Sequence, residues 1–197
     1  MDKGQYYVTV CASGGGGNFE EIIKSQKKVG YKVNLLIVDR ECGAIDKAKK
    51  YNIPYVFLDK KELGEGFFSV MDRTIPVNTD LIVLAGFLTI INSAFCQKWQ
   101  GRIINTHPSL LPKYGGKGMY GVKVQEAVLK NKDELAGCTV HYVSEKIDEG
   151  EIILQRTVKV NEGESAWELG GRVFLEENKL LVEAIKVIMS RQADQNI

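Results

Sequence analysis

The sequence predicts an α/β protein with a doubly wound, mostly parallel sheet and antiparallel strands toward the C-terminus. Over the first hundred or so residues, short β-branched runs alternate with amphipathic helical stretches, which is typical of a parallel sheet covered by helices. The run Leu81–Ala85 is apolar throughout, as expected of a strand buried on both faces. After about residue 110, two β-rich segments joined by a polar turn indicate that the chain returns antiparallel.

Strands and helices of the first half follow in order from these signals. Aromatic and β-branched clusters between turn residues predict strands at Tyr6–Ala12, Lys32–Val38, Tyr55–Leu58, Leu81–Ala85 and Arg102–Asn105. Apolar residues at helical spacing predict helices from Asn18 to about Lys28, and over Ala44–Lys50, Phe67–Thr74 and Ser93–Trp99. We expect Asn18 to cap the first helix and Gly30 to end it.

The second half is expected to be a helix, an antiparallel pair of strands and a long closing helix. The predicted segments are a helix at Val122–Lys130, strands at Cys138–Val143 and Glu151–Val160, and a helix over about Ser165–Arg191. The polar turn Ser144–Gly150 joins the two strands. No repeat or linker divides the 197 residues, so a single domain over 1–197 is expected.

Composition narrows the function classes. Lys and Arg total 26 against 25 Asp and Glu, so no global field favours nucleic acid. The four cysteines are scattered without a C-x-x-C pair, which indicates neither a zinc site nor a disulfide framework and suits a reducing cytosol. No apolar run has the roughly 20 residues of a membrane helix, and the start lacks a signal-peptide layout. We therefore expect a cytoplasmic protein without metal, membrane or nucleic-acid partners.

A glycine-rich loop, Ser13–Asn18, stands where the first strand meets the first helix. Backbone N–H groups and the positive helix end converge there, which predicts a phosphate cradle; the alternative is a tight turn without a ligand. The dinucleotide pattern is only half present, because Phe19 occupies the third glycine position. Asp39 ends the second strand where a ribose-binding acid would stand, so a nicotinamide-dependent oxidoreductase remains an alternative.

Polar residues also follow the last strand of the first half. Asn105 and His107 are two residues apart on an extended chain and project to the same side, and Pro108 fixes the exit. An amide beside an imidazole suits stabilisation of an oxyanion, although both could be structural. Asp148 could orient the imidazole or a water if the fold brought it near, and is otherwise a solvated turn carboxylate. His141, within an alternating strand, is expected to be structural.

Three long motifs and the glycine loop resemble one family. The motifs are LAGFL at Leu84–Leu88, NTHPSLLPKY at Asn105–Tyr114 and GCTVHYVSEKIDEGEIILQ at Gly137–Gln155, with SGGGGN at Ser13–Asn18. Together they resemble the glycinamide ribonucleotide transformylases, folate-dependent enzymes of purine synthesis. The resemblance implies a Rossmann-like formyltransferase fold, with a nucleotide phosphate bound by about residues 1–100 and catalysis and folate binding in about 101–197.

The resemblance also implies roles for individual residues. Asn105, His107 and Asp148 match the family's catalytic residues. Substrate contacts fall on Gly16, Gly17, Asn18, Gly86, Pro108 and Glu177, of which Glu177 matches the carboxylate that receives the glycinamide amine. The pterin pocket of the folate falls on Leu88, Thr89, Ile91, Val143, Ser144 and Asp148.

The implied reaction is formyl transfer from 10-formyltetrahydrofolate, a co-substrate, to the amine of glycinamide ribonucleotide, without a metal. The expected partners are these small molecules, in a monomer or homodimer. An amino sugar nucleotide is the alternative acceptor. A tRNA formyltransferase is disfavoured because it should carry an RNA-binding domain. The sequence departs from the family at Gly17, where serine is commoner, at Thr106, where an aliphatic residue is usual, and over Gly115–Gly121.

Overall fold

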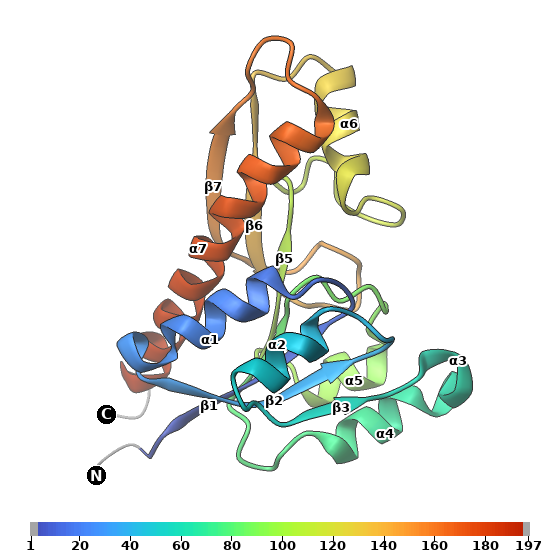
Figure 1. The fold of residues 1–197 in the computed structure, drawn as a ribbon, viewed down its shortest axis with the longest axis vertical. Coiled ribbons are helices and arrows are strands. Elements are labelled where there is room, and N and C mark those ends of the chain that lie inside the picture. The colour runs from blue at the N-terminus through green and yellow to red at the C-terminus, as the bar shows by residue number, and fades with distance from the viewer. Residues whose placement is uncertain (1–3, 195–197) are drawn as a thin grey trace. The chain divides into compact units, whose positions relative to one another are not determined.

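The computed structural model describes residues 4–194 and has the predicted α/β architecture (Figure 1). The strands are β1 (Tyr6–Ala12), β2 (Tyr31–Val38), β3 (Tyr55–Phe57), β4 (Leu81–Leu84), β5 (Ile103–His107), β6 (Leu135–Tyr142) and β7 (Ile152–Lys159). The helices are α1 (Gly17–Val29), α2 (Ala44–Lys50), α3 (Lys60–Leu63), the 3-10 helix η1 (Gly64–Gly66), α4 (Phe67–Thr74), α5 (Ser93–Lys98), α6 (Val122–Lys130) and α7 (Ala166–Asp194). Over the described residues, the sheet order is β3-β2-β1-β4-β5-β6-β7.

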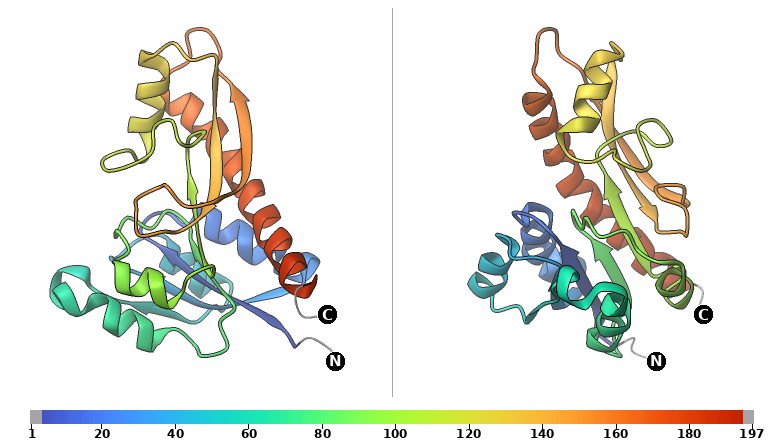
Figure 2. Two further views of the ribbon diagram at one scale, coloured as in Figure 1. Left: turned by 180° about the vertical axis from the view of Figure 1, so that it is seen from behind. Right: turned by 90° about the vertical axis from the view of Figure 1, so that its right-hand side faces the viewer.

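The chain forms two compact units, one ending at Ile104 and the other beginning at Asn105. In the first unit, β1 pairs in parallel with β2 and with β4, and β2 pairs in parallel with β3. Figure 2 shows helices on both faces of these strands. All four residues of β4 are buried, as predicted for a strand covered on both faces. The carboxyl ends of β1 and β4 therefore meet at one edge, where open α/β sheets bind ligands.

In the second unit, β6 and β7 form the predicted antiparallel pair. The register runs from Leu135 opposite Lys159 to His141 opposite Ile152, with an irregularity between Val140 and His141. The long helix α7 packs on both strands and on α6. Its buried apolar side chains include Leu169, Leu180 and Ile188.

The structure corrects three details of the sequence prediction. Asn18 does not cap α1, because the helix begins at Gly17 and its N-cap is Gly16 in the left-handed conformation. β5 continues to His107 instead of ending at Asn105. The short helix α3 and the 3-10 turn after it lie in a segment for which no element was predicted, and the Asp59 side chain caps α3 by accepting from Lys61 N–H at 2.7 Å.

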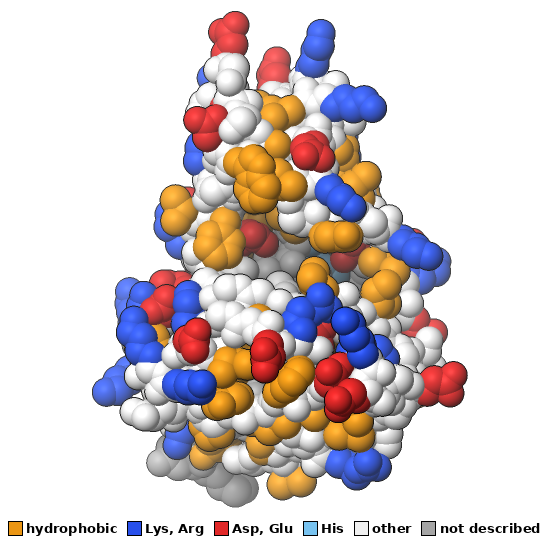
Figure 3. All heavy atoms as spheres, turned by 45° about the vertical axis from the view of Figure 1, so that its right-hand side comes forward, with side chains coloured by type: hydrophobic (Ala, Val, Ile, Leu, Met, Phe, Trp, Pro, Cys, Tyr) orange, Lys and Arg blue, Asp and Glu red, His pale blue; other side chains and the backbone are white. Residues whose placement is uncertain are grey.

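Two general properties concern the surface. On the face in Figure 3, basic and acidic side chains are interspersed instead of gathered by sign. None of the helices formed within residues 4–194 is long and apolar enough to span a bilayer.

Candidate functional site

The glycine loop follows β1 and is tied to the segment that follows β4. Ser13 N–H donates to the Gly86 carbonyl at 3.0 Å, and Leu88 N–H donates to Ser13 Oγ at 2.8 Å. Gly16 has φ +71°, and a Cβ there would lie 2.8 Å from the Ala44 Cα. Only glycine fits this position, since any side chain would meet both backbone strain and the start of α2. The loop therefore brings main-chain groups close together without side chains between them.

The first turn of α1 has a buried polar atom without a partner. Asn18 is 6% exposed, and its Oδ1 has no hydrogen-bond partner among the described residues. Since the two ends of a side-chain amide are interchangeable by rotation, its NH₂ group could instead face this position. The free N–H groups at the start of a helix of 13 residues lie in the same turn. A phosphate oxygen fits this set of donors.

Asp39, the candidate ribose-binding acid, accepts hydrogen bonds from other residues of the first unit. Its side chain has 0% exposure and accepts from the Arg40 guanidinium at 3.1 and 3.2 Å and from the Thr89 hydroxyl at 2.6 Å. Burial raises the pKa of Asp39, but the hydrogen bonds from Arg40, Thr89 and Ser13 outweigh it and hold the pKa below its usual value. This carboxylate joins the ends of neighbouring strands, which argues against the nicotinamide alternative.

Three residues predicted for the pterin pocket follow β4. Leu88 is half exposed, Ile91 is buried, and the Thr89 hydroxyl is bound by Asp39. Thr89 can therefore contribute its methyl group and main chain to a ligand, but not a free hydroxyl. Gly86, at φ +73°, turns the chain at the start of this segment.

In the second unit, β5 carries the predicted amide and imidazole. Asn105 and His107 lie on one side of the strand, and His107 is only 4% exposed. His107 Nδ1 lies 3.5 Å from Asp148 Oδ2, and His107 Nε2 donates to the Tyr114 carbonyl at 2.7 Å. The Gln125 amide fixes the adjacent Pro108 by donating to its carbonyl at 2.7 Å. The structure thus brings His107 and Asp148 into contact, although 41 residues separate them.

His141 joins Asn105 to this pair. Its Nε2 lies 3.2 Å from Asn105 Nδ2 and 3.7 Å from Asp148 Oδ1, and its Nδ1 lies 2.9 Å from the Tyr142 carbonyl. Since a carbonyl only accepts, Nδ1 carries the proton and Nε2 accepts from the Asn105 amide. Burial lowers the pKa of His141, against the opposing effects of the Tyr142 carbonyl and Asp148, which keeps the ring neutral.

These contacts are compatible with the predicted structural role of His141, but the prediction did not include its contact with Asn105. One signal was available in the sequence, because His141 is one of only two histidines and lies within the GCTVHYV motif that carries the family resemblance. The irregular register between Val140 and His141, which only the structure reveals, bears on where the ring points.

Thr106, between Asn105 and His107, points to the opposite side of β5 and meets Glu177 of α7. The Thr106 hydroxyl donates to Glu177 Oε1 at 2.9 Å. Burial raises the pKa of Glu177 to about 7, and the Thr106 hydrogen bond opposes that rise. Glu177 is therefore a buried carboxyl group that gains or loses its proton near neutral pH.

The turn 143–150 holds Asp148 in the left-handed conformation, with φ +58°. Beside it lies a cavity of about 470 Å³, whose lining includes Leu111, Pro112 and Ile147. Val143 and Ser144, predicted for the pterin pocket, are half-buried at the start of the turn. The chain between residues 4 and 194 contains no group of three or more His, Cys, Asp or Glu side chains that could hold a metal ion.

A parallel α/β sheet with a glycine loop between its first strand and first helix, together with an amide–imidazole–carboxylate cluster, is typical of a group-transfer enzyme. The chain belongs to the formyl transferase family, whose model matches residues 7–185. A curated relative, the chloroplastic phosphoribosylglycinamide formyltransferase of Arabidopsis thaliana, is 37% identical over 188 residues. That alignment covers 92% of this chain but 64% of the relative, so the chain spans less than two thirds of that protein's length.

Solved structures give the same relationship. Glycinamide ribonucleotide transformylase 1 from Symbiobacterium toebii matches with a TM-score of 0.87 at 29% identity, over 96% of this chain and 91% of that one. Phosphoribosylglycinamide formyltransferase from Anaplasma phagocytophilum matches with a TM-score of 0.84 at 31% identity, over 94% of this chain and 88% of that one. These matches confirm the predicted fold class and the family resemblance.

Proposed function

We propose that the protein transfers the formyl group of 10-formyltetrahydrofolate to the amine of glycinamide ribonucleotide. Family membership and the names of its relatives support the reaction class and the acceptor. The observation that carries the proposal is the cluster of Asn105, His107 and Asp148, with His107 Nδ1 lying 3.5 Å from Asp148 Oδ2.

The proposed chemistry is a direct acyl transfer. The neutral amine of the acceptor attacks the formyl carbon, forming a C–N bond and a tetrahedral intermediate whose oxygen is negative. The nitrogen of the acceptor then loses a proton, and the folate nitrogen gains one as its bond to carbon breaks. The products are the formamide and tetrahydrofolate. The enzyme needs no nucleophile of its own, because the amine is already nucleophilic once neutral.

The three side chains fit three tasks in this reaction. A side-chain amide has two N–H donors; His141 accepts one from Asn105, and we assign the other to the developing oxyanion. His107 presents its Nδ1 side to the reacting groups, since its Nε2 is held by the Tyr114 carbonyl. Asp148 accepts the proton of the attacking amine, directly or through water, and delivers it to the folate nitrogen.

Binding roles divide between the units. We assign the phosphate of the acceptor to the backbone of Gly16 and Gly17 and to the Asn18 amide, with Gly86 and Pro108 as further contacts. Glu177 would bind the acceptor in its ammonium form, which must lose one proton before the neutral amine attacks. The carboxylate form of Glu177 becomes more abundant as the pH rises past its pKa of about 7. From the family resemblance, we assign the pterin of 10-formyltetrahydrofolate to Leu88, Thr89 and Ile91 in the first unit and to Val143, Ser144 and Asp148 in the second. We further propose that the protein acts in the cytoplasm, although the Arabidopsis relative is named as chloroplastic.

The test is a formyl-transfer assay with 10-formyltetrahydrofolate and two acceptors, glycinamide ribonucleotide and an amino sugar nucleotide. We expect formylation of glycinamide ribonucleotide, and a loss of about 10²–10³ in kcat for Asn105→Ala, the magnitude typical of one oxyanion donor. Asp148→Asn should lose at least as much. Its matched control is Glu149→Gln, which removes a neighbouring carboxylate that is 63% exposed and should stay near wild type. Formylation of the amino sugar nucleotide alone would refute the proposed acceptor.

A further inference from the structure

Three consecutive residues hold both members of the His107–Asp148 pair through their main chain. The Tyr114 carbonyl accepts from His107 Nε2 at 2.7 Å, and Gly116 N–H donates to Asp148 Oδ2 at 2.9 Å. We call residues 114–116 the backbone clip. One end of the clip fixes the imidazole and the other fixes the carboxylate, so a shift of this segment would move both groups.

The clip needs glycine at its centre. A Cβ on Gly115 would lie 2.7 Å from Leu111 Cδ2 and 3.3 Å from Asp148 Cβ. Tyr114 and Gly116 have φ +55° and +93°, so the left-handed conformation flanks Gly115 on both sides. Tyr114 adopts this conformation at a cost that other contacts must offset.

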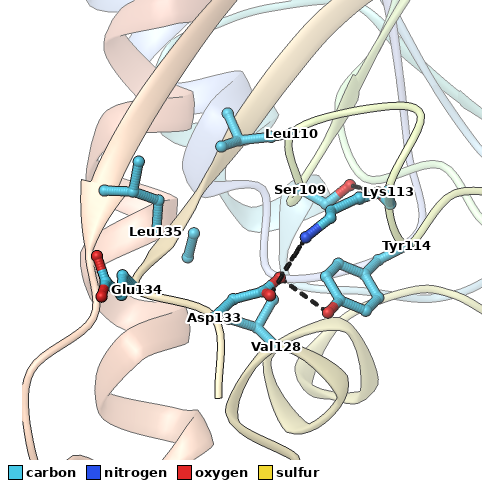
Figure 4. A pocket seen from close by; sticks show the side chains of 9 residues that line it. Ser109, Leu110, Lys113, Tyr114, Val128, Asp133, Glu134 and Leu135 are labelled. Carbon is cyan, nitrogen blue, oxygen red and sulfur yellow. Dashed lines mark hydrogen bonds and ion pairs between the residues drawn. The ribbon is translucent and has the colours of Figure 1, made fainter. Parts of the chain in front are cut away.

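Those contacts come from the Tyr114 side chain, which is anchored away from the pair. The Tyr114 hydroxyl donates to Asp133 Oδ2 at 2.9 Å and accepts from Asn131 Nδ2 at 2.8 Å. Lys113 Nζ lies 3.2 and 3.1 Å from the two oxygens of the same Asp133 carboxylate. Figure 4 shows Lys113 and Tyr114 both pointing at Asp133 on one wall of a cavity of about 390 Å³.

The Asp133 carboxylate, which binds the Tyr114 hydroxyl, stays negatively charged at neutral pH. The hydrogen bonds from Tyr114 and Lys113 hold the pKa of Asp133 below its usual value. A carboxylate that accepts from two side chains fixes the direction of both, because hydrogen bonds to a charged group are shorter and stronger than neutral ones.

The clip also determines which ring nitrogen of His107 carries the proton. Both ring nitrogens face oxygen acceptors, the Tyr114 carbonyl at Nε2 and Asp148 at Nδ1. A neutral imidazole has one N–H, whereas an imidazolium has two and matches both acceptors. In the neutral ring, the Tyr114 carbonyl favours the tautomer that carries its proton on Nε2. Nδ1 can then accept a proton on the side that faces Asp148.

We propose that Tyr114 and Asp133 are positioning residues: their hydrogen bond holds the backbone clip, and through it the protonation pattern and alignment of His107 and Asp148. The inference rests on the proposed function for its effect on catalysis, but its effect on the His107 ring does not depend on any substrate. Neither side chain needs to touch a reacting atom.

The decisive measurement is the ¹⁵N–¹H correlation spectrum of the histidine rings, recorded across pH on the full chain. With only two histidines, a His107→Asn variant assigns both rings. We expect the neutral His107 ring of the wild type to carry its proton on Nε2, which faces the Tyr114 carbonyl. In Tyr114→Phe and Asp133→Asn, the Nδ1–H tautomer of neutral His107 should become populated, with the His141 signals less affected.

The matched control is Tyr120→Phe, which removes another tyrosine hydroxyl from a nearby loop. Tyr120 is 50% exposed and meets only Lys123, at 3.4 Å, among the hydrogen bonds of the described residues. Its His107 spectrum should match wild type. In the formyl-transfer assay, Tyr114→Phe and Asp133→Asn should lower kcat about tenfold and move its pH profile, with KM within twofold and Tyr120→Phe unchanged.

The outcomes separate this inference from the proposed function. Wild-type His107 signals in folded Tyr114→Phe and Asp133→Asn proteins overturn the inference, even if formyl transfer is confirmed. Altered His107 signals in a protein that formylates no acceptor support the clip and refute the proposed function. If Tyr114→Phe does not fold, Asp133→Asn decides, because it keeps the tyrosine ring in place.

Discussion

Among residues 4–194, each unit buries one carboxyl group, and the two groups behave in opposite ways. Asp39 of the first unit accepts hydrogen bonds from Arg40, Thr89 and Ser13, and its pKa lies below the usual value although burial opposes this. Glu177 of the second unit accepts from Thr106, and burial raises its pKa to about 7. The difference lies in the number and charge of the donors, because both groups are removed from water.

The comparison separates a carboxylate with several hydrogen-bond donors from one with a single donor. Asp39 has its acceptors filled by its own unit, so a ligand would have to displace a guanidinium and two hydroxyl groups. Glu177 has one such donor, and an incoming ammonium group would supply what it lacks. Desolvated, weakly paired carboxyl groups of this kind are frequent at functional sites.

The largest expected effect is the loss of the Asp39 carboxylate. Asp39→Ala should lower the free energy of unfolding by about 4 kcal/mol, because it leaves buried donors without an acceptor. Urea unfolding at pH 7 measures this value. A loss below about 1 kcal/mol would show that the carboxylate does not hold the strand ends together.

Replacing Glu177 should raise the free energy of unfolding, by an amount that depends on pH. The folded-state pKa of Glu177 is about 7, above the ordinary value of 4.5, so the folded protein keeps a proton that the unfolded chain releases. Wild-type stability therefore falls as the pH rises between these values. Glu177→Gln removes that effect and should be more stable than wild type by up to about 3 kcal/mol at pH 8, with little gain at pH 4.5.

The adjacent Glu176 is the matched control for this prediction. Hydrogen bonds from Lys179 and Arg156 outweigh partial burial and hold the pKa of Glu176 below its usual value. Glu176→Gln should therefore give no gain at pH 8. Thermal or urea unfolding of both variants at the two pH values makes the test, and an equal gain in both would contradict the assignment of the effect to Glu177.

A smaller change in the free energy of unfolding is expected for a conservative substitution at Thr106. Thr106→Val removes the one hydroxyl that donates to Glu177, at 2.9 Å, and should move the pKa of Glu177 further upward. We expect a loss of about 2 kcal/mol in unfolding free energy at pH 8, since the lost bond is to a charged group. The loss should shrink at pH 5, where the carboxyl is protonated, and a loss independent of pH would point to packing instead.

The smallest change in the free energy of unfolding is expected for a threonine-to-valine substitution in the first unit, at Thr89. Thr89→Val removes one donor from Asp39, but the Arg40 guanidinium and Ser13 remain. A loss of about 1 kcal/mol is expected, with little dependence on pH between 5 and 8. A loss that grew with pH and exceeded that of Thr106→Val would reverse the comparison on which these predictions depend.

Periodicity was sufficient to predict the regular elements. The helices Ala44–Lys50, Phe67–Thr74 and Val122–Lys130 lie where their apolar spacing and flanking turn residues placed them. Asn18 was wrongly predicted as a cap, because a left-handed Gly16 against Ala44 moves the start of α1 two residues earlier than an asparagine cap at position 18 would allow. Local side-chain preference could not reveal that tertiary contact.

In the second unit, the candidate site was predictable only where it depends on side chains. Asn105, His107 and Asp148 could be proposed from their chemistry and from the family resemblance, although no spacing rule places residue 148 beside residue 107. The contacts of the backbone clip belong to main-chain atoms, which every residue has, so no residue type announces them. Likewise, His141 is identified by where its ring points and not by its presence in a strand.

The irregular register beside His141 limits how the hairpin of β6 and β7 can vary in length. Val140 is opposite Leu154 while His141 is opposite Ile152, so Ile153 is an extra residue on the returning strand. Side chains alternate between the two faces of a strand, so deleting Ile153 would change which residues face the cluster. A one-residue deletion in either strand before this point would likewise exchange the inner and outer surfaces of the hairpin.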